Sequence, residues 1–209
     1  MSCKRNSAAN NCRNRRETIN GPGLHSLKEI VSFYRKRHYD ALERELGDFE
    51  GVYKEKGLKE LIRTSAGGKA LQTGKTMPHQ SFIPENSLQQ WMDKLSGIAE
   101  EIARCHTFEQ LHKRLETEMA NIYGIGPLTC YDTALRIAYA LGFPPRDYVY
   151  LHAGAQLPGE KAQKNGCIAV NVLTKDITEE LPAYHIENML CLYKDNLAPF
   201  GSLKKNKTK

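Results

Sequence analysis

The residues best suited to chemistry lie in one stretch, Glu118 to Gly142, which reads EMANIYGIGPLTCYDTALRIAYALG. Gly124 and Gly126 stand where a backbone must bend sharply or be approached closely. Pro127 follows, and its fixed φ and missing N–H suit the first position of a helix. A helix that begins there offers unpaired N–H groups and a partial positive charge, which together favour a phosphate group. The spacing therefore predicts a helix, a glycine turn and a second helix, with an anion site at the turn.

This stretch resembles the helix-hairpin-helix motif, whose pattern is a hydrophobic residue, a Gly-hydrophobic-Gly turn and a helix with small and apolar positions. The resemblance implies that the turn and the second helix's N-terminus hold a nucleic-acid backbone phosphate. DNA-binding members often carry Lys or Arg just after the second glycine, whereas here the first cation after the turn is Arg136. The nucleic-acid-binding residues expected on this basis are Tyr123, Gly124, Ile125, Gly126, Thr129 and Arg136. An αα-hairpin that serves only packing is the alternative.

Asp132 carries a second resemblance, to the helix-hairpin-helix DNA glycosylase superfamily, whose catalytic Asp lies in a Val-Asp-Thr-His-like segment. The corresponding run here is Tyr131-Asp132-Thr133-Ala134. The resemblance implies an enzyme in which Asp132 activates water or stabilises a cationic sugar, with His152 or Tyr131 assisting. The sequence departs from the family pattern because no His or Asn follows Asp-Thr and because Asp132 falls inside the hairpin's own second helix. An Asp near a helix start also interacts well with the helix dipole, so a structural role is the alternative.

A further candidate group begins at His152, which ends the apolar run from Tyr148 to Leu151. An imidazole beside small residues can act as an acid, a base or a phosphate contact, and a buried structural histidine is the alternative. Lys161 and Lys164 follow, so the sequence predicts a phosphate-facing cluster of these two lysines with His152. The segments GIGPLTCYDTALRI and YLHAGA also resemble segments shared by a group of proteins without an assigned activity, over roughly residues 78–195.

Other motifs argue against a cofactor, a metal and a membrane span. Five residues separate Gly68 from Gly74, whereas the phosphate-binding P-loop needs four. The six cysteines form no Cys-x-x-Cys pair and no zinc spacing, so we expect no metal and no cofactor. No stretch approaches ~18 consecutive apolar residues, so we expect no membrane span. The N-terminus lacks the apolar core of a secretory signal, which favours an intracellular location, cytoplasmic or nuclear (nucleoid).

The positive charge is concentrated at the two ends of the chain. Residues 1–16 carry +5 and residues 203–209 carry +4, so a chain of net charge +6 leaves residues 17–202 with −3. We expect two disordered basic tails, residues 1–20 and 201–209, around a helical domain at residues 21–200 with the hairpin at 118–142. Such tails can bind phosphates without sequence preference, and solubilising ends are the alternative.

The elements that must position these residues are mostly helical. Apolar spacing close to 3.6 residues predicts helices, and Thr107 begins a capping-box pattern. The expected helices are Leu24 to Leu46, Phe49 to Ile62 with an interruption at Gly57, a helix capped by Asn86 or Ser87 and running through Ile102, Thr107 to the Gly124 turn, the hairpin's second helix to Gly142, a short helix from Gly159 to Lys164, and Pro182 to Tyr193. Ser65 to Pro84 is predicted to be a loop, and Tyr148 to Leu151 and Ile168 to Leu173 to be extended. The sequence thus predicts a mainly α single domain with little or no sheet.

These features together predict a nucleic-acid-associated binding protein, with DNA preferred to RNA as its partner. A DNA glycosylase-like base-excision enzyme, with Asp132 and His152 as catalytic residues, is one alternative. A helical protein-interaction domain without nucleic-acid binding is the other. The sequence does not decide whether the protein is an enzyme, and it indicates no particular protein partner.

Overall fold

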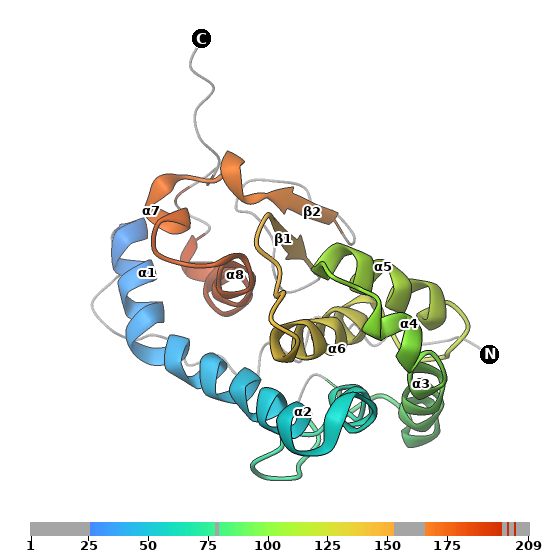
Figure 1. Ribbon diagram of the computed structural model, residues 1–209. Coiled ribbons are helices and arrows are strands. Elements are labelled where there is room, and N and C mark those ends of the chain that lie inside the picture. The colour runs from blue at the N-terminus through green and yellow to red at the C-terminus, as the bar shows by residue number, and fades with distance from the viewer. Residues whose placement is uncertain (1–25, 78–79, 153–165, 198–199, 201–202, 204–209) are drawn as a thin grey trace, which may run out of the picture.

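The computed structural model describes residues 26–77, 80–152, 166–197, 200 and 203. Within these residues the chain is mainly α-helical, with one two-stranded sheet, which confirms the predicted fold class (Figure 1). The expected tail at residues 1–20 and the expected short helix from Gly159 to Lys164 lie outside the described residues. At the other end, Leu203 is buried, so the described core extends beyond residue 200.

The first described helices form one long rod that is kinked at Gly57: α1 (Leu27–Tyr34), a π-helix (Arg35–Tyr39) and α2 (Asp40–Ala66). Ser26 caps α1 through a capping box with Glu29. The prediction of two separate helices, ending at Leu46 and resuming at Phe49, is wrong. Both of these apolar side chains are buried, so an unbroken helix places them in the core, and Gly47 between them continues the helix. The expected interruption at Gly57 is present, because this residue has φ of 78° inside α2.

Three shorter helices follow: α3 (Glu85–Gly97), α4 (Ala99–Ala103) and α5 (Phe108–Met119). Pro84, rather than Asn86 or Ser87, occupies the N-cap of α3, and the expected single helix through Ile102 is broken at Ile98. The break follows Gly97, which weakens a helix interior. The start of α5 is as predicted, since the Thr107 hydroxyl accepts a hydrogen bond from the Gln110 amide at 3.2 Å.

The second half of the chain contains α6 (Pro127–Ala140), β1 (Tyr148–Leu151), β2 (Gly166–Ala169), α7 (Lys175–Thr178) and α8 (Ala183–Leu197). Gly142 has φ of 87° and ends α6, and the Phe143 amide reaches back to the Ala138 carbonyl in a Schellman motif. The strands pair antiparallel, with Tyr148 opposite Ala169. The expected strand at residues 148–151 is confirmed, whereas the expected extended run at 168–173 turns into a 3₁₀-helix at Val170–Val172.

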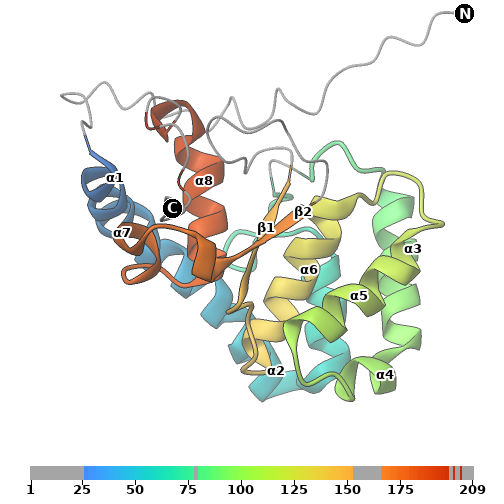
Figure 2. The ribbon, with the colours of Figure 1, turned by 90° about the horizontal axis from the view of Figure 1, so that it is seen from above.

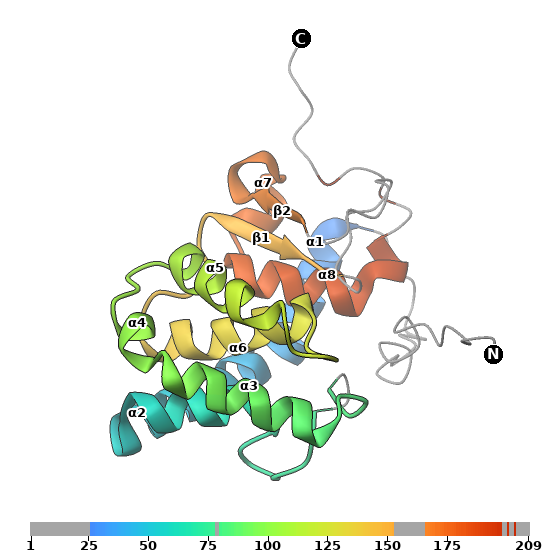
Figure 3. The ribbon, with the colours of Figure 1, turned by 90° about the vertical axis from the view of Figure 1, so that its right-hand side faces the viewer.

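Two hydrophobic clusters fill the part of the chain that the structure describes. The first lies among α2, α3, α4, α5 and α6 and contains Trp91, Phe49 and Phe108. The second lies among α1, the two strands, α7 and α8. Figure 2 shows α1, α7 and α8 on one side and α3, α5 and α6 on the other, with the strands between them, and Figure 3 shows α2 running below α3. The candidate residues of α6 and β1 therefore lie where the two helical groups meet.

Candidate functional site

The glycine turn joins α5 to α6 as the sequence predicts. Gly124 has φ of 83°, and a Cβ there would lie 3.1 Å from Pro84 Cδ. Both the backbone conformation and the close neighbour therefore favour glycine at this position. Gly126 is the N-cap of α6 in an extended conformation, and a Cβ there would meet nothing within 4 Å. The N-cap residue Gly126 has no side chain to cap α6. Among the described residues, the first N–H groups of this 14-residue helix, those of Leu128 and Thr129, therefore have no acceptor from an N-cap side chain.

The other predicted residues of the turn differ in exposure. The Tyr123 side chain is 85% exposed, whereas Ile125 and Thr129 are buried. The loop before α3 adds a feature that the sequence did not indicate, because Phe82 is 58% exposed and its neighbour Ile83 lies against Gly124. The rings of Tyr123 and Phe82 are the most exposed large apolar side chains among the described residues. The exposed Phe82 ring therefore lies next to a residue that contacts the glycine turn, which itself bears the exposed Tyr123 ring.

Arg136 does not reach this surface. Its side chain is buried, with 4% exposure, and its guanidinium donates to the Ser65 carbonyl and to Met77 Sδ. It also lies 3.7 Å from Glu45 and 5.3 Å from the centre of the Phe49 ring. The expected phosphate contact is therefore corrected: Arg136 holds α6 against α2 and the loop that follows it. Lys161 and Lys164 lie outside the described residues.

The two predicted catalytic residues lie close enough to interact electrostatically. Asp132, in the second turn of α6, is half-buried and accepts a long hydrogen bond of 3.4 Å from Gln80 Nε2. His152 follows β1, and its ring centre is 4.8 Å from that of Tyr131. Both ring nitrogens of His152, the Tyr131 hydroxyl and Gln80 Oε1 are buried without a hydrogen-bond partner among the described residues. Such a concentration of unsatisfied buried polar atoms is unusual in a folded protein and marks a candidate site.

The charge state of His152 follows from this environment. Burial lowers the pKa of His152 to about 4, against the opposing field of the Asp132 carboxylate, which favours the charged imidazole. The ring is therefore neutral at pH 7, with one nitrogen able to donate and the other able to accept. Burial, followed by the charges of Glu187 and Asp132, raises the pKa of the Tyr131 hydroxyl, so this phenol keeps its proton. A neutral imidazole beside a carboxylate has the composition of a general-base site.

A second polar group, centred on Glu43 of α2, was not found from the sequence. The Glu43 carboxylate accepts hydrogen bonds from the Tyr139 and Tyr184 hydroxyls, both at 3.0 Å, and from His185 Nε2 at 2.8 Å. His185 Nδ1 lies 2.8 Å from the Tyr34 hydroxyl, which also accepts a hydrogen bond from Asn188 Nδ2 at 3.0 Å. We call these six residues the Glu43 network. Its members come from α1, α2, α6 and α8, so no local sequence pattern could have revealed it.

The protons of the Glu43 network have one consistent arrangement. Burial alone would raise the pKa of Glu43, but the hydrogen bonds from His185, Tyr139 and Tyr184 hold it below its ordinary value. Burial lowers the pKa of His185, against the hydrogen bond to Glu43. His185 is thus neutral and donates through Nε2, so its Nδ1 accepts the Tyr34 proton. The π-helix supports this arrangement by stacking Tyr39 on the His185 ring, with centres 3.9 Å apart and planes within 1°.

A small cleft lies beside the Glu43 network, among α2, α6 and α8. Its volume is about 100 Å³. The polar residues that line it are Glu45, Asp132, Arg136, Tyr184, Glu187 and Asn188. Asp132 therefore lines this cleft and also accepts the hydrogen bond from Gln80, whose Oε1 is one of the unsatisfied atoms. Pockets for drug-sized ligands have volumes of about 300–1,000 Å³, and the volume of this cleft is smaller. The cleft therefore has room for a single small chemical group.

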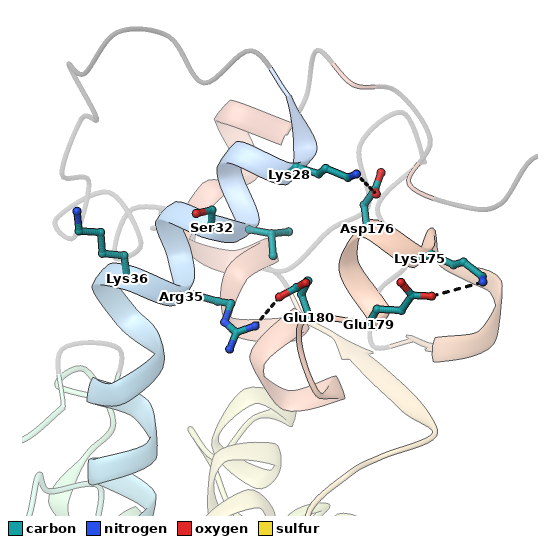
Figure 4. A pocket seen from close by; sticks show the side chains of 9 residues that line it. Lys28, Ser32, Arg35, Lys36, Lys175, Asp176, Glu179 and Glu180 are labelled. Atoms are coloured by element: carbon teal, nitrogen blue, oxygen red, sulfur yellow. Dashed lines mark hydrogen bonds and ion pairs between the residues drawn. The ribbon is translucent and has the colours of Figure 1, made fainter.

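A larger groove of about 690 Å³ lies between α1 and α7. Most of its charged residues form ion pairs, two of these pairs across the groove and one within α7 and the residue after it (Figure 4). The pairs are Lys28 with Asp176, Arg35 with Glu180 and Lys175 with Glu179. Lys36 points away from these acids in the same view. Because each of the three acids in the groove is already paired with a cation, the groove offers no defined ligand chemistry.

Three further findings bear on function. Among the described residues, no group of three or more His, Cys, Asp or Glu side chains has an arrangement that could hold a metal ion. None of the helices in the described part of the chain is long and apolar enough to span a membrane. No protein-family model, curated protein or solved structure matches this chain. Functional arguments therefore rest on the residues and their geometry.

Proposed function

We propose that the protein binds nucleic acid, with DNA preferred to RNA, and that the turn from Tyr123 to Thr129 contacts a backbone phosphate. The observation that carries the proposal is the amino end of α6, which has no side-chain cap and follows a turn that only glycine can make at residue 124. N–H groups at such a position, with the partial positive charge of the helix, are a recurring phosphate-binding arrangement. The exposed Tyr123 ring beside it adds a surface on which a sugar or base can pack.

The test uses the one turn glycine that tolerates a side chain. In Gly126→Asp, the new carboxylate occupies the N-cap, accepts hydrogen bonds from the first amides of α6 and repels phosphate. Gly126→Ala is the matched control, because its methyl group meets nothing within 4 Å and leaves those amides free. Fluorescence anisotropy with labelled single-stranded and duplex oligonucleotides should show affinity weakened about tenfold by the Asp variant at 100 mM salt and less than twofold by the Ala variant.

The two ends of the chain are a competing explanation for any binding. A variant that lacks residues 1–16 and 204–209 has lost a charge of +9, which is +5 from the first segment and +4 from the second, where Lys204 is the first cation. If this variant loses all affinity while Gly126→Asp in the full chain binds as wild type does, the proposal for the turn is wrong. If the shortened chain retains binding that Gly126→Asp abolishes, the turn is the contact.

A second candidate function, base excision, is favoured by one specific observation. His152 packs against Tyr131, the residue before Asp132, with ring centres 4.8 Å apart, and the Asp132 carboxylate opposes the lowering of the His152 pKa by burial. In this function Asp132 activates water or stabilises a cationic sugar, and the neutral His152 assists. Purified protein should then release a base from at least one of a panel of damaged duplexes, and Asp132→Asn should slow release at least 100-fold. Absence of release from every duplex would remove this candidate.

A further inference from the structure

One connected group of aromatic rings joins α5, α6 and β1, and it contains two histidines. Within α5, the rings of Phe108 and His112 are stacked, with centres 5.6 Å apart and planes 12° apart. Tyr150 of β1 packs against both of them, at 5.0 and 4.9 Å between ring centres. Tyr131 of α6 contacts Tyr150 at 5.5 Å and His152 at 4.8 Å. We call these residues the histidine group.

Polar atoms of the histidine group are buried but unpaired. The exposed fractions of His112, Tyr131 and His152 are 8%, 1% and 5%. His112 Nε2, the Tyr131 hydroxyl and both ring nitrogens of His152 have no hydrogen-bond partner among the described residues. Apolar rings in the same places would avoid the cost of burying these atoms. Unlike such rings, an imidazole can take up a proton, and its charged form is far more costly to bury than its neutral form.

The strand β1 contacts both hydrophobic clusters, one with each of its faces, and it lies between the two groups of helices (Figure 2). Successive side chains of a strand point to opposite faces. Val149 and Leu151 are buried in the second cluster, whereas Tyr150 packs against the first. His152 comes two residues after Tyr150 and, like it, contacts Tyr131, so both lie on the face directed to α5 and α6. The histidine group is therefore the contact of β1 with these two helices.

The charges around His112 come from its own helix. Burial lowers the pKa of His112 below its ordinary value of 6.5, and Lys113 acts in the same direction. Glu116 and Glu109 oppose this change, and Glu116 Oε1 lies 4.0 Å from His112 Nδ1. The side chains that face His112 from α6 and β1 are the tyrosines of the histidine group, and burial raises the pKa of both, so they stay uncharged.

The charges around His152 come from α6 and α5. Burial lowers the pKa of His152 to about 4, the Asp132 carboxylate opposes this change, and a charge on His112 adds to it. Glu187 of α8 acts on the neighbouring Tyr131, whose pKa is raised mainly by burial. Because a proton on either histidine disfavours a proton on the other, the closed histidine group excludes both protons.

We propose that the histidine group is a pH-dependent contact: in acid, Tyr150 and His152 move away from α5 and α6, both histidines take up protons, and β1 stays on the second hydrophobic cluster. The released histidines bind protons near their ordinary pKa of about 6.5, so opening becomes more favourable as the pH falls below that value. Opening exposes the Tyr131 and Tyr150 rings while the helices stay folded. None of these residues belongs to the turn from Tyr123 to Thr129, so this contact is independent of nucleic-acid binding there.

The test is a titration of the full-length protein from about pH 7.5 to about pH 4, followed by ¹H–¹⁵N NMR. Signals of β1 and of the facing residues of α5 and α6 should change in one transition that takes up about two protons. In the same range, far-ultraviolet circular dichroism and the fluorescence of the buried Trp91 should stay native, because the helices do not unfold. Uptake of a single proton, or loss of the helical signal in the same transition, would overturn the proposal.

Variants then assign the two protons. His112→Phe and His152→Phe each replace a proton-binding ring by a planar apolar one, so each transition should take up about one proton, and the double variant should show none. His106→Gln is the matched control, because this histidine is exposed and lies just before α5, and it should leave the transition unchanged. If one Phe variant does not fold, the proton count of the wild type and the other variant still decide. A transition that persists in the double variant would contradict the role of the histidines.

Discussion

At the scale of single residues, His152 is costly to bury in free energy, and its imidazole has the nitrogens that acid–base chemistry needs. Its imidazole is 5% exposed, and neither nitrogen has a hydrogen-bond partner among the described residues. An apolar ring in the same place would avoid that cost. Residues that reduce stability in this way are typical of functional sites, where natural sequences break the rules of good packing.

We therefore expect His152→Phe to stabilise the protein by about 1–2 kcal/mol at pH 7, because it removes two unsatisfied buried nitrogens. The effect should grow in acid. Since the folded pKa of His152 is about 4 and the ordinary value about 6.5, the unfolded chain takes up the proton first, and wild type loses about 3 kcal/mol as the pH falls from 6.5 to 4. Urea unfolding at several pH values measures this slope, which the Phe variant should flatten.

The exposed His106 gives the control for this prediction, and His106→Gln should leave the pH slope as it is in wild type. A loss of stability in His152→Phe at pH 7 would contradict the argument. It would mean that the imidazole nitrogens are satisfied in solution, for example by an ordered water.

Single residues also show what the sequence could and could not reveal. Asp132 and His152 were identified by residue type and by their places after a glycine turn and an apolar run, and in the structure His152 packs against Tyr131, the residue before Asp132. Arg136 was assigned to phosphate because it is the first cation after the glycine turn, but its helix turns it toward Ser65 and Glu45. Glu43 and His185 are 142 residues apart, and only the packing of α8 against α2 brings them together.

At the scale of elements, the turn between α5 and α6 separates the roles of its two glycines. Gly124→Ala should destabilise the protein by about 1–2 kcal/mol or more, because it forces an L-residue to a φ of 83° and presses its methyl group on Pro84. Gly126→Ala should cost less than about 0.5 kcal/mol, since its backbone is ordinary and its surroundings are open. Thermal unfolding of the two variants measures the difference. Equal losses would show that the turn is not held as described.

Helices with strong periodicity and caps were the predictable elements. Thr107 starts α5 and Gly142 ends α6 because short-range hydrogen bonds decide both ends. The π-helix that connects α1 to α2 could not be predicted from short-range hydrogen bonds. The π-helix at Arg35–Tyr39 shifts the register of the rod so that both Tyr34 and Tyr39 contact His185, and this gain depends on a partner distant in the sequence. Long-range contacts thus override the local pattern there.

At the scale of the whole molecule, the Glu43 network connects two hydrophobic clusters. Tyr139 and Tyr184 pack with the first cluster, and Tyr34 belongs to the second. The ionised Glu43 accepts three hydrogen bonds between them, and the rod that carries it runs through both groups of helices (Figure 1). The network therefore supports cooperative unfolding of the two clusters as one unit.

Glu43→Gln tests this coupling. A neutral amide cannot accept from all three donors, so we expect a loss of about 2 kcal/mol at pH 7. Because hydrogen bonds hold the folded pKa of Glu43 below its ordinary value of 4.5, its contribution is present above that pH and is lost as the pH falls through the folded pKa. The difference between wild type and variant should therefore shrink in acid.

The single tryptophan makes the loss of coupling visible. Trp91 is fully buried in the first cluster, so its fluorescence reports that cluster, whereas far-ultraviolet circular dichroism reports every helix. In urea, the two signals should change together in wild type, and in Glu43→Gln the dichroism should begin to fall at a lower concentration because the second cluster opens first. Glu100→Gln, which removes an exposed surface pair with Arg104, should keep the signals coincident and cost less than about 0.5 kcal/mol. Coincident signals in Glu43→Gln, with unchanged stability at pH 7, would show that the clusters are held together by packing alone and that the network serves the cleft rather than the fold.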